Sequence, residues 1–265
     1  MMNYQSFEND SVTPALGAPF FEEHLARYLF ASKYAAHKSV LELGCGHGYG
    51  AYLLAQSAQS VLACDLNSES LNFARTHYAK SNLEFIKDTV IQSSGQLFKY
   101  ELVISLEVLE HIQPEETSAY LTRIRAHLAP GGRAIISTPN HEVVLKSGMP
   151  IPIFHINNFS SRELKCLLEK HFTKVEMFGQ IQKQGALGNT LYYLDRWNLR
   201  HSSFVKNFRK IQTKTLQTNT VSQTQRHPQK DFNPWKIEQG LGGAPSYQFS
   251  KNLWRQAGMT LAVCS

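Results

Sequence analysis

The clearest feature of the chain is an alternation of short apolar runs with longer segments in which apolar residues recur every three to four positions. The short runs predict buried strands, and the recurrent spacing predicts amphipathic helices. An alternation of this kind is typical of an α/β protein with a mostly parallel sheet. The strand-like runs are residues 40–43, 60–65, 82–90, 102–106, 128–140, 172–180 and 258–265.

The segments between these runs carry helix signals. Residues 20–36 repeat apolar residues at four-residue steps, and His24 on this helix is predicted to pack against the domain edge. Asn67 and Pro114 stand where helices should begin, and residues 160–163 (SSRE) form a capping box. Residues 141–158 show no clear periodicity, so they predict an irregular loop that follows a strand and covers an acceptor site.

These elements predict one domain over residues 1–265. Residues 1–37 would form an N-terminal arm and lid helix, and residues 38–180 the ligand-binding core. Residues 181–257 would form an insertion or cap before the last strand, residues 258–265. The length and the apolar content of 42% are enough for one large packed core.

The stretch VLELGCGHGYG, residues 40–50, predicts a strand, a glycine turn and the start of a helix. Glycines let a backbone turn tightly and approach a ligand, and a helix N-terminus attracts a polar ligand group. The turn also fits the dinucleotide fingerprint G-x-G-x-x-G/A. However, Glu42 precedes the first glycine by two residues, and the turn lacks Arg and Lys. These features favour a cationic sulfonium cofactor over a pyrophosphate.

A second carboxylate follows at the end of the next predicted strand. Asp65 lies 21 residues after Gly44, near the ~20 residues expected for an acid that binds the ribose hydroxyls of a nucleoside cofactor. A third predicted strand ends at Asp88, and a fourth ends next to Glu107. Because open α/β sheets bind ligands at the carboxyl ends of their strands, Glu107 should face the ligand crevice. For Asp88, a surface turn is the alternative to a binding role.

Several motifs occur together in the order of a known family. They are E-x-G-x-G at 42–46, E-V-L-E-H-I at 107–112, P-G-G at 130–132, S-T-P-N at 137–140, and F-H before N-x-F-S at 154–160. The chain resembles the class I S-adenosylmethionine-dependent methyltransferases, above all bacterial small-molecule, surface-glycan, sugar and ubiquinone-pathway enzymes. The resemblance implies a Rossmann-like, seven-stranded, mostly parallel sheet with helices on both faces, an antiparallel last strand, an N-terminal helix and a C-terminal insertion.

The resemblance also implies S-adenosyl-L-methionine as cofactor and S-adenosyl-L-homocysteine as product. Arg27 would bind the cofactor carboxylate, for which a guanidinium offers bidentate pairing, and Asp88 would lie near the adenine amino group. The expected cofactor-binding residues are Arg27, Glu42, Gly44, Gly46, Gly48, Tyr49, Asp65, Leu66, Asp88, Thr89, Leu106 and Glu107.

The chemistry implied is in-line methyl transfer to an oxygen or nitrogen of a small molecule, sugar or glycan intermediate. A hydroxyl acceptor must lose a proton, and a general base assists this step. His155 is the first candidate base and His111 the second, with a structural role as the alternative for each. No spaced His/Cys/Asp/Glu group indicates a metal site, so none is predicted.

Charge is uneven along the chain. The net charge is +6, and residues 195–236 hold nine Lys/Arg against two Asp/Glu. One alternative is therefore an RNA or protein methyltransferase that uses this segment as a phosphate clamp. Nucleic acid is not the favoured partner, because the segment lacks the regular alternation of aromatic and basic residues that a nucleic-acid groove shows. Two further alternatives are a non-catalytic nucleotide-binding protein and an NAD(P)-dependent oxidoreductase.

The remaining signals concern location. The first ten residues do not resemble a signal peptide, and no apolar run reaches the ~18 residues that a membrane span needs. Cys45, Cys64, Cys166 and Cys264 form no C-x-x-C pair, which favours a reduced, cytoplasmic location. The sequence carries no signal for the oligomeric state.

Overall fold

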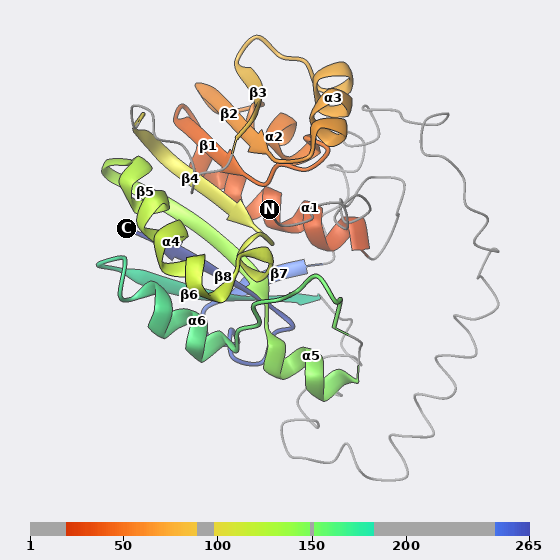
Figure 1. Ribbon diagram of the computed structural model, residues 1–265. Helices are drawn as coiled ribbons and strands as arrows, with labels where there is room; N and C mark the ends of the chain where they lie inside the picture. Colours follow the sequence, from red (N-terminus) through yellow and green to blue (C-terminus); the bar gives the residue numbers. More distant parts are fainter. Residues whose placement is uncertain (1–19, 89–97, 149–150, 183–246) are drawn as a thin grey trace, which may run out of the picture. The chain divides into compact units, whose positions relative to one another are not determined.

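The computed structural model describes residues 20–88, 98–148, 151–182 and 247–265 (Figure 1). The predictions for the N-terminal arm, for Thr89 and for the basic segment 195–236 lie outside the described residues, as does most of the predicted insertion.

A single mixed sheet organises the described part of the chain. Its strand order is β3-β2-β1-β4-β5-β8-β6-β7. Strands β1 to β5 pair in parallel, and β8 pairs antiparallel with both β5 and β6. The strands are β1 Ser39–Leu43, β2 Ser60–Asp65, β3 Leu83–Lys87, β4 Tyr100–Leu106, β5 Leu128–Pro139, β6 Val175–Gln182, β7 Tyr247–Ser250 and β8 Met259–Cys264.

This sheet confirms the predicted Rossmann-like fold, with its antiparallel last strand between β5 and β6. The sheet nevertheless has eight strands where the sequence predicted seven. The additional strand, β7, lies within residues that were assigned to the insertion. It has only four residues, two of them polar, and it lies at the sheet edge. An edge strand this short leaves no apolar run for a periodicity argument to detect.

Helices lie on both faces of the sheet (Figure 1). Helix α1 contacts α2 and β4, whereas α4 contacts β4 and β5, and α6 contacts β8. Asn67 caps α3 and Ser160 caps α6 with a complete capping box, as the sequence predicted. The helices are α1 Phe20–Ala35, α2 Tyr49–Leu54, α3 Ser68–His77, η3 Leu109–His111, η4 Pro114–Glu116, α4 Thr117–His127, α5 His141–Ser147 and α6 Ser161–Leu168.

Alternate strand residues pack against α4 and α6. The helices contribute Leu121 and Ile124 from α4 and Leu164 and Leu168 from α6, and all four side chains are fully buried. The strands contribute Leu41, Leu43, Val103, Ala134, Ile136, Ala262 and Cys264 to the same cluster. Burial of each large apolar side chain contributes roughly 1.5–3 kcal/mol, so this layer fixes where the strand ends lie.

Helix α5 corrects the prediction of an irregular loop over residues 141–158. None of its residues is buried, so it has no apolar face that periodicity could reveal. It begins after Asn140, whose carbonyl accepts from the amides of Val143 and Val144, and it ends at Gly148 in a left-handed conformation. Residues 151–158 that follow contain no helix or strand and carry His155.

The register of the sheet aligns the ends of three central strands. Leu43 at the end of β1 lies opposite Cys64 of β2 and Ser105 of β4. The chain therefore leaves β1, β2 and β4 at one edge, and β1 lies where the strand order reverses. Open α/β sheets bind ligands at this position.

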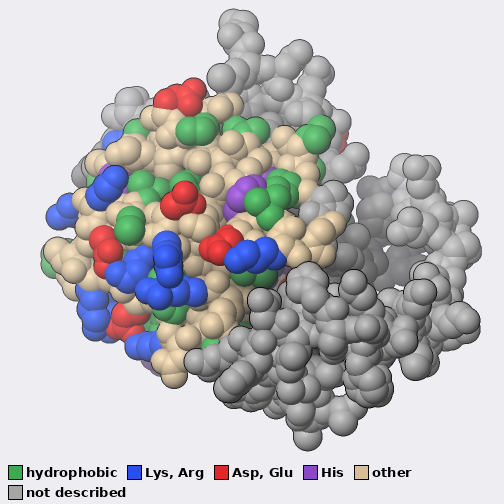
Figure 2. All heavy atoms as spheres, turned by 90° about the horizontal axis from the view of Figure 1, so that it is seen from below, with side chains coloured by type: hydrophobic (Ala, Val, Ile, Leu, Met, Phe, Trp, Pro, Cys, Tyr) green, Lys and Arg blue, Asp and Glu red, His purple; other side chains and the backbone are tan. Residues whose placement is uncertain are grey.

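The surface carries mixed charge. On the face seen from below, Lys and Arg side chains gather among a few acidic ones (Figure 2). Exposed pairs such as Lys174–Glu176 contribute little to stability. All four cysteines are free. Within the described residues, no helix has both the length and the apolar character for a membrane crossing.

Gly48 and Gly131 offer a matched test of packing around the glycine turn. Both have positive φ, 83° and 73°. A Cβ on Gly48 would lie 2.6 Å from Ala74 and 2.8 Å from the Phe85 ring, whereas a Cβ on Gly131 meets nothing within 4 Å. We expect Gly48→Ala to lower the free energy of unfolding by about 1–3 kcal/mol more than Gly131→Ala does. Urea denaturation measures both, and equal losses would contradict close packing at Gly48.

Candidate functional site

Four backbone amides of the glycine turn after β1 donate hydrogen bonds to acceptors within the protein. The Gly44 and Cys45 amides both donate to the Cys64 carbonyl, at 2.9 and 3.0 Å. The Gly46 amide donates to Asp65 Oδ2 at 2.7 Å, and the Gly48 amide donates to the Cys45 carbonyl at 3.0 Å. These four donors have acceptors within the protein, so they do not form a cradle for a pyrophosphate.

Glu42 is a buried carboxyl in the middle of the sheet. Its side chain is 1% exposed, and its hydrogen-bonding neighbour is the Tyr28 hydroxyl. Burial raises the pKa of Glu42 to about 7; the nearby Tyr28 hydroxyl opposes this rise, and the negative charge of Asp65 adds to it. A cationic ligand group nearby would stabilise the charged form.

Asp65 lies at the end of β2, where the sequence predicted a ribose contact. Its two oxygens accept the amides of Gly46 and Asn67, the second at 2.8 Å. The Asp88 amide donates to the Asp65 carbonyl at 3.3 Å, and the Leu66 side chain is 49% exposed. The structure thus brings three predicted residues to one edge of the sheet.

A buried ion pair joins α1 to the end of β4. Arg27 is 1% exposed, and its Nη2 pairs with Glu107. Its Nη1 donates to Gln180 Oε1 at 2.6 Å, while Nε has no hydrogen-bond partner among the described residues. His24 Nε2 lies 3.1 Å from the second Glu107 oxygen. His24 is therefore part of the site, and the prediction that it only packs at the domain edge was wrong.

Glu107 is both charged and strained. Its φ of 56° is unusual for a residue other than glycine, and such backbone strain tends to occur at functional sites. Burial raises the pKa of Glu107, but Arg27 and His24 outweigh this effect and hold the pKa at about 2. The carboxylate therefore stays ionised throughout the physiological range.

Tyr49 and Leu106 lie in the core next to these residues. The Tyr49 ring centroid lies 5.1 Å from that of Phe21 and 5.3 Å from that of Tyr28. The Tyr49 hydroxyl is buried without a hydrogen-bond partner in the described ranges. Leu106 ends β4 and is 8% exposed.

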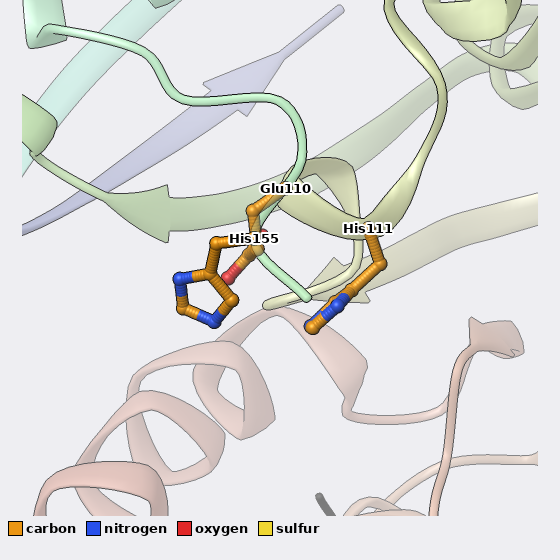
Figure 3. Close-up of side chains that lie close together, drawn as sticks. All are labelled: Glu110, His111 and His155. Carbon is orange, nitrogen blue, oxygen red and sulfur yellow. The ribbon is translucent and has the colours of Figure 1, made fainter. Parts of the chain in front are cut away.

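Glu110, His111 and His155 converge beside the ion pair (Figure 3). The first two belong to η3, and His155 comes from the segment before α6. One ligand atom from each lies within 4.8 Å of the others. The Asn157 amide donates to the Glu110 carbonyl at 3.1 Å, and the Asn157 side chain donates to Thr117 Oγ1 at 2.7 Å. These two bonds hold the His155 segment against η3.

Burial controls the ionisation of the three side chains. Burial, together with His155, lowers the pKa of His111 to about 4. Burial also lowers the pKa of His155, although Glu107 opposes the shift. Burial, together with the Glu107 charge, raises the pKa of Glu110 to about 8. Both imidazoles are therefore neutral at pH 7 and can accept a proton or bind a cation.

Three residues of this site were missed from the sequence: His24, Glu110 and Gln180. Glu110 stands within E-V-L-E-H-I, and Gln180 ends the predicted strand 172–180, but neither pattern indicates the partner of the residue.

Comparison with known proteins finds a match over the core. Residues 40–132 match the family model described as a methyltransferase domain. This part of the chain, less than half of its length, is therefore similar to methyltransferase domains. It contains the glycine turn, Asp65 and the η3 residues, whereas Arg27 and His155 lie outside the matched range.

Relatives of this domain include named methyltransferases. A probable S-adenosylmethionine-dependent methyltransferase from Mycolicibacterium smegmatis is 27% identical over 59% of this chain and 60% of its own length. A ubiquinone biosynthesis O-methyltransferase from Serratia proteamaculans is 38% identical over 39% of this chain and 43% of its own length. The chain thus spans less than two thirds of these relatives.

Solved structures share the fold. The N-methyltransferase NodS from Bradyrhizobium japonicum, in complex with S-adenosyl-L-homocysteine, aligns with a TM-score of 0.55 and 19% identity over 69% of this chain and 89% of that chain. The PH0226 protein from Pyrococcus horikoshii aligns with a TM-score of 0.53 and 22% identity, over 66% and 92% of the two chains.

The raised pKa of the buried Glu42 carboxyl can be tested through the pH dependence of protein stability. Its folded pKa of about 7 lies above the usual 4.5, so the stability that the protonated form contributes is complete below pH 4.5 and is lost as the pH rises through 7. Relative to Glu42→Gln, the ligand-free wild type should lose on the order of 1–3 kcal/mol of unfolding free energy between pH 5 and pH 8. Urea denaturation at both values measures this, with exposed Glu84→Gln as control. A difference that does not vary with pH would argue against the raised pKa.

Proposed function

We propose that this chain is a methyltransferase that uses S-adenosyl-L-methionine and methylates an oxygen or nitrogen of a small molecule, sugar or glycan intermediate. The observation that carries the proposal is the set of acidic side chains at the ends of the central strands. Glu42 lies in β1, Asp65 ends β2 and Glu107 follows β4, and four amides of the turn after β1 are already bonded within the protein.

This arrangement suits a cationic ligand better than a phosphate ligand. A pyrophosphate needs free N–H donors or basic side chains at the turn. Four turn amides are used internally, and the turn holds neither Arg nor Lys. A sulfonium and an α-ammonium group would instead be stabilised by nearby carboxylates. The alternative of an NAD(P)-dependent oxidoreductase is therefore disfavoured.

The predicted binding residues fit one cofactor orientation. Asp65 retains lone pairs for ribose hydroxyls, while exposed Leu66 and Asp88 stand beside it for the adenine ring. Arg27 has a buried Nε without a partner in the described residues, which fits a further anionic group such as the cofactor carboxylate. Glu107 stays ionised and can pair with the α-ammonium group of the cofactor. When bound, the cofactor supplies an activated methyl group.

The acceptor would lie on the other side of Glu107, at Glu110, His111 and His155. His155 contributes to the lowered pKa of the Glu107 carboxyl, which supports placing the two groups close together. A neutral His155 can take part in removing the acceptor proton. The names of similar proteins include both an O-methyltransferase and an N-methyltransferase, so they do not choose between oxygen and nitrogen. The predicted cytoplasmic location remains part of this proposal.

Calorimetry with S-adenosyl-L-homocysteine tests cofactor binding. We expect saturable binding of one ligand per chain and none of NADH. Asp65→Ala should weaken binding by roughly 10–100-fold, the effect of losing hydrogen bonds to a charged group. Asp65→Asn keeps one acceptor oxygen for the turn and should show an intermediate loss, while Glu84→Ala on β3 should bind normally. Absence of binding at millimolar ligand would overturn the proposed function.

A second test separates turnover from cofactor affinity. His155→Ala should lower methyl transfer to a panel of hydroxylated acceptors by roughly 10²–10⁴-fold, with little change in S-adenosyl-L-homocysteine affinity. The control is His127→Ala, because His127 Nδ1 contacts the Phe98 carbonyl, near the start of β4 at the opposite edge of the sheet. Release of S-adenosyl-L-homocysteine measures turnover, and full activity of His155→Ala would remove this residue from the acceptor site.

A further inference from the structure

We propose that Glu110, His111 and His155 form a binding site for a divalent first-row transition-metal ion, such as Zn²⁺ or Mn²⁺. Two imidazole nitrogens and one carboxylate oxygen form a set of ligands that these ions prefer. The three ligand atoms lie within 4.8 Å of one another, and the three side chains lie close together (Figure 3). The sequence predicted no metal site, because His155 is far from the other two along the chain.

The geometry needs only a small adjustment to hold an ion. Ligands bonded to Zn²⁺ at ~2.0–2.1 Å in a tetrahedral arrangement lie roughly 3.4 Å from one another. The side chains must therefore move together by about 1 Å, which small rotations of the imidazole and carboxylate groups supply. Glu110 and His111 are neighbours on η3, and the bonds of Asn157 hold the His155 segment against this helix.

Glu110 is the strongest single indication of a missing cation. It is 2% exposed, and its Oε2 atom is buried without a hydrogen-bond partner among the described residues. A buried polar atom without a partner is costly, and buried charges are normally paired or coordinate metals. Of the nearby cationic groups, Arg27 is already paired with Glu107. The Thr138 hydroxyl acts on this carboxyl by a hydrogen bond, and a bound cation would supply the partner that Oε2 lacks.

The groups around the two histidines resemble the surroundings of metal ligands. A hydrogen bond with the Phe154 backbone acts on the His111 ring, which stacks on the Phe154 ring with centroids 5.7 Å apart. Metal-binding histidines commonly donate their other N–H to a backbone carbonyl, which fixes the ring orientation. Asn157 anchors the segment that carries His155 by bonding to the Glu110 carbonyl and to Thr117.

A metal ion bound at Glu110, His111 and His155 would take part in methyl transfer, and this step rests on the proposed function. Three protein ligands leave open positions for an acceptor hydroxyl. Coordination lowers the pKa of a bound hydroxyl, so its proton passes to water. An oxygen lone pair then forms the new C–O bond while the electrons of the breaking C–S bond return to sulfur. The proposal therefore favours an oxygen acceptor over a nitrogen acceptor.

Metal binding can be measured without cofactor or acceptor. The full chain, treated with a chelator and then dialysed, would be titrated by calorimetry with ZnCl₂, MnCl₂ and MgCl₂. We expect one saturable site per chain for Zn²⁺ and Mn²⁺ and weaker binding of Mg²⁺, which prefers oxygen ligands. CoCl₂ should produce a visible absorption band typical of nitrogen ligation. Absence of a saturable site for all four ions would overturn the proposal.

Matched variants assign the site to these residues. Glu110→Gln and His155→Gln should each weaken Zn²⁺ binding at least ~10-fold, given that even indirect partners of a metal site change affinity by 10–100-fold. Glu142→Gln, on exposed helix α5, and His127→Gln, at the opposite sheet edge, should bind normally. Circular dichroism checks that each variant is folded. Unchanged Zn²⁺ affinity in folded Glu110→Gln and His155→Gln would contradict the assignment.

The result is separable from that for the proposed function. Calorimetry with S-adenosyl-L-homocysteine in the presence of a chelator tests the cofactor site alone, and Zn²⁺ titration without cofactor tests the metal site alone. If S-adenosyl-L-homocysteine binds and no ion does, the metal proposal fails and His155 acts directly as the base. If ions bind and S-adenosyl-L-homocysteine does not, the proposed function fails while the metal site stands.

Discussion

The site depends on the buried ion pair between Arg27 and Glu107. Arg27 lies on α1 and Glu107 follows β4, so the pair connects the N-terminal helix to the centre of the sheet. Gln180 of β6 accepts a further bond from the same guanidinium. Removal of one partner from a buried pair typically costs 3–5 kcal/mol because the other charge is left uncompensated. The pair thus connects α1 to the end of β4, and loss of either partner alone would weaken this connection.

The same pair holds a strained backbone. Glu107 keeps a left-handed φ while its amide bonds to the backbone and side chain of Ser137 at 3.1 and 3.2 Å. Its side chain is held by Arg27 and His24. Such a conformation persists only where surrounding contacts over-determine it. The strained residue thereby directs its carboxylate towards Arg27 and His24 of α1.

The parts of the fold that depend on local patterns were predictable from sequence. The strand, glycine turn and helix around Gly44 to Gly48, the Ser160 capping box and Asp65 at the end of β2 all follow from short-range spacing. The parts that were missed depend on tertiary contacts or lack an apolar face. Helix α5 buries nothing, and β7 is a short edge strand. The meeting of Glu110 with His155 depends on Asn157 folding the chain back onto η3.

The hydrogen bonds inside the glycine turn have a consequence for ligand affinity. Because Cys64, Asp65 and Cys45 already hold the turn amides, the backbone has its final shape before any guest arrives. No segment there has to become ordered during association, so little conformational entropy is lost at that step. The free energy of the contacts at the turn therefore contributes almost fully to ligand affinity. The ligand-free and ligand-bound forms of this loop should superimpose closely.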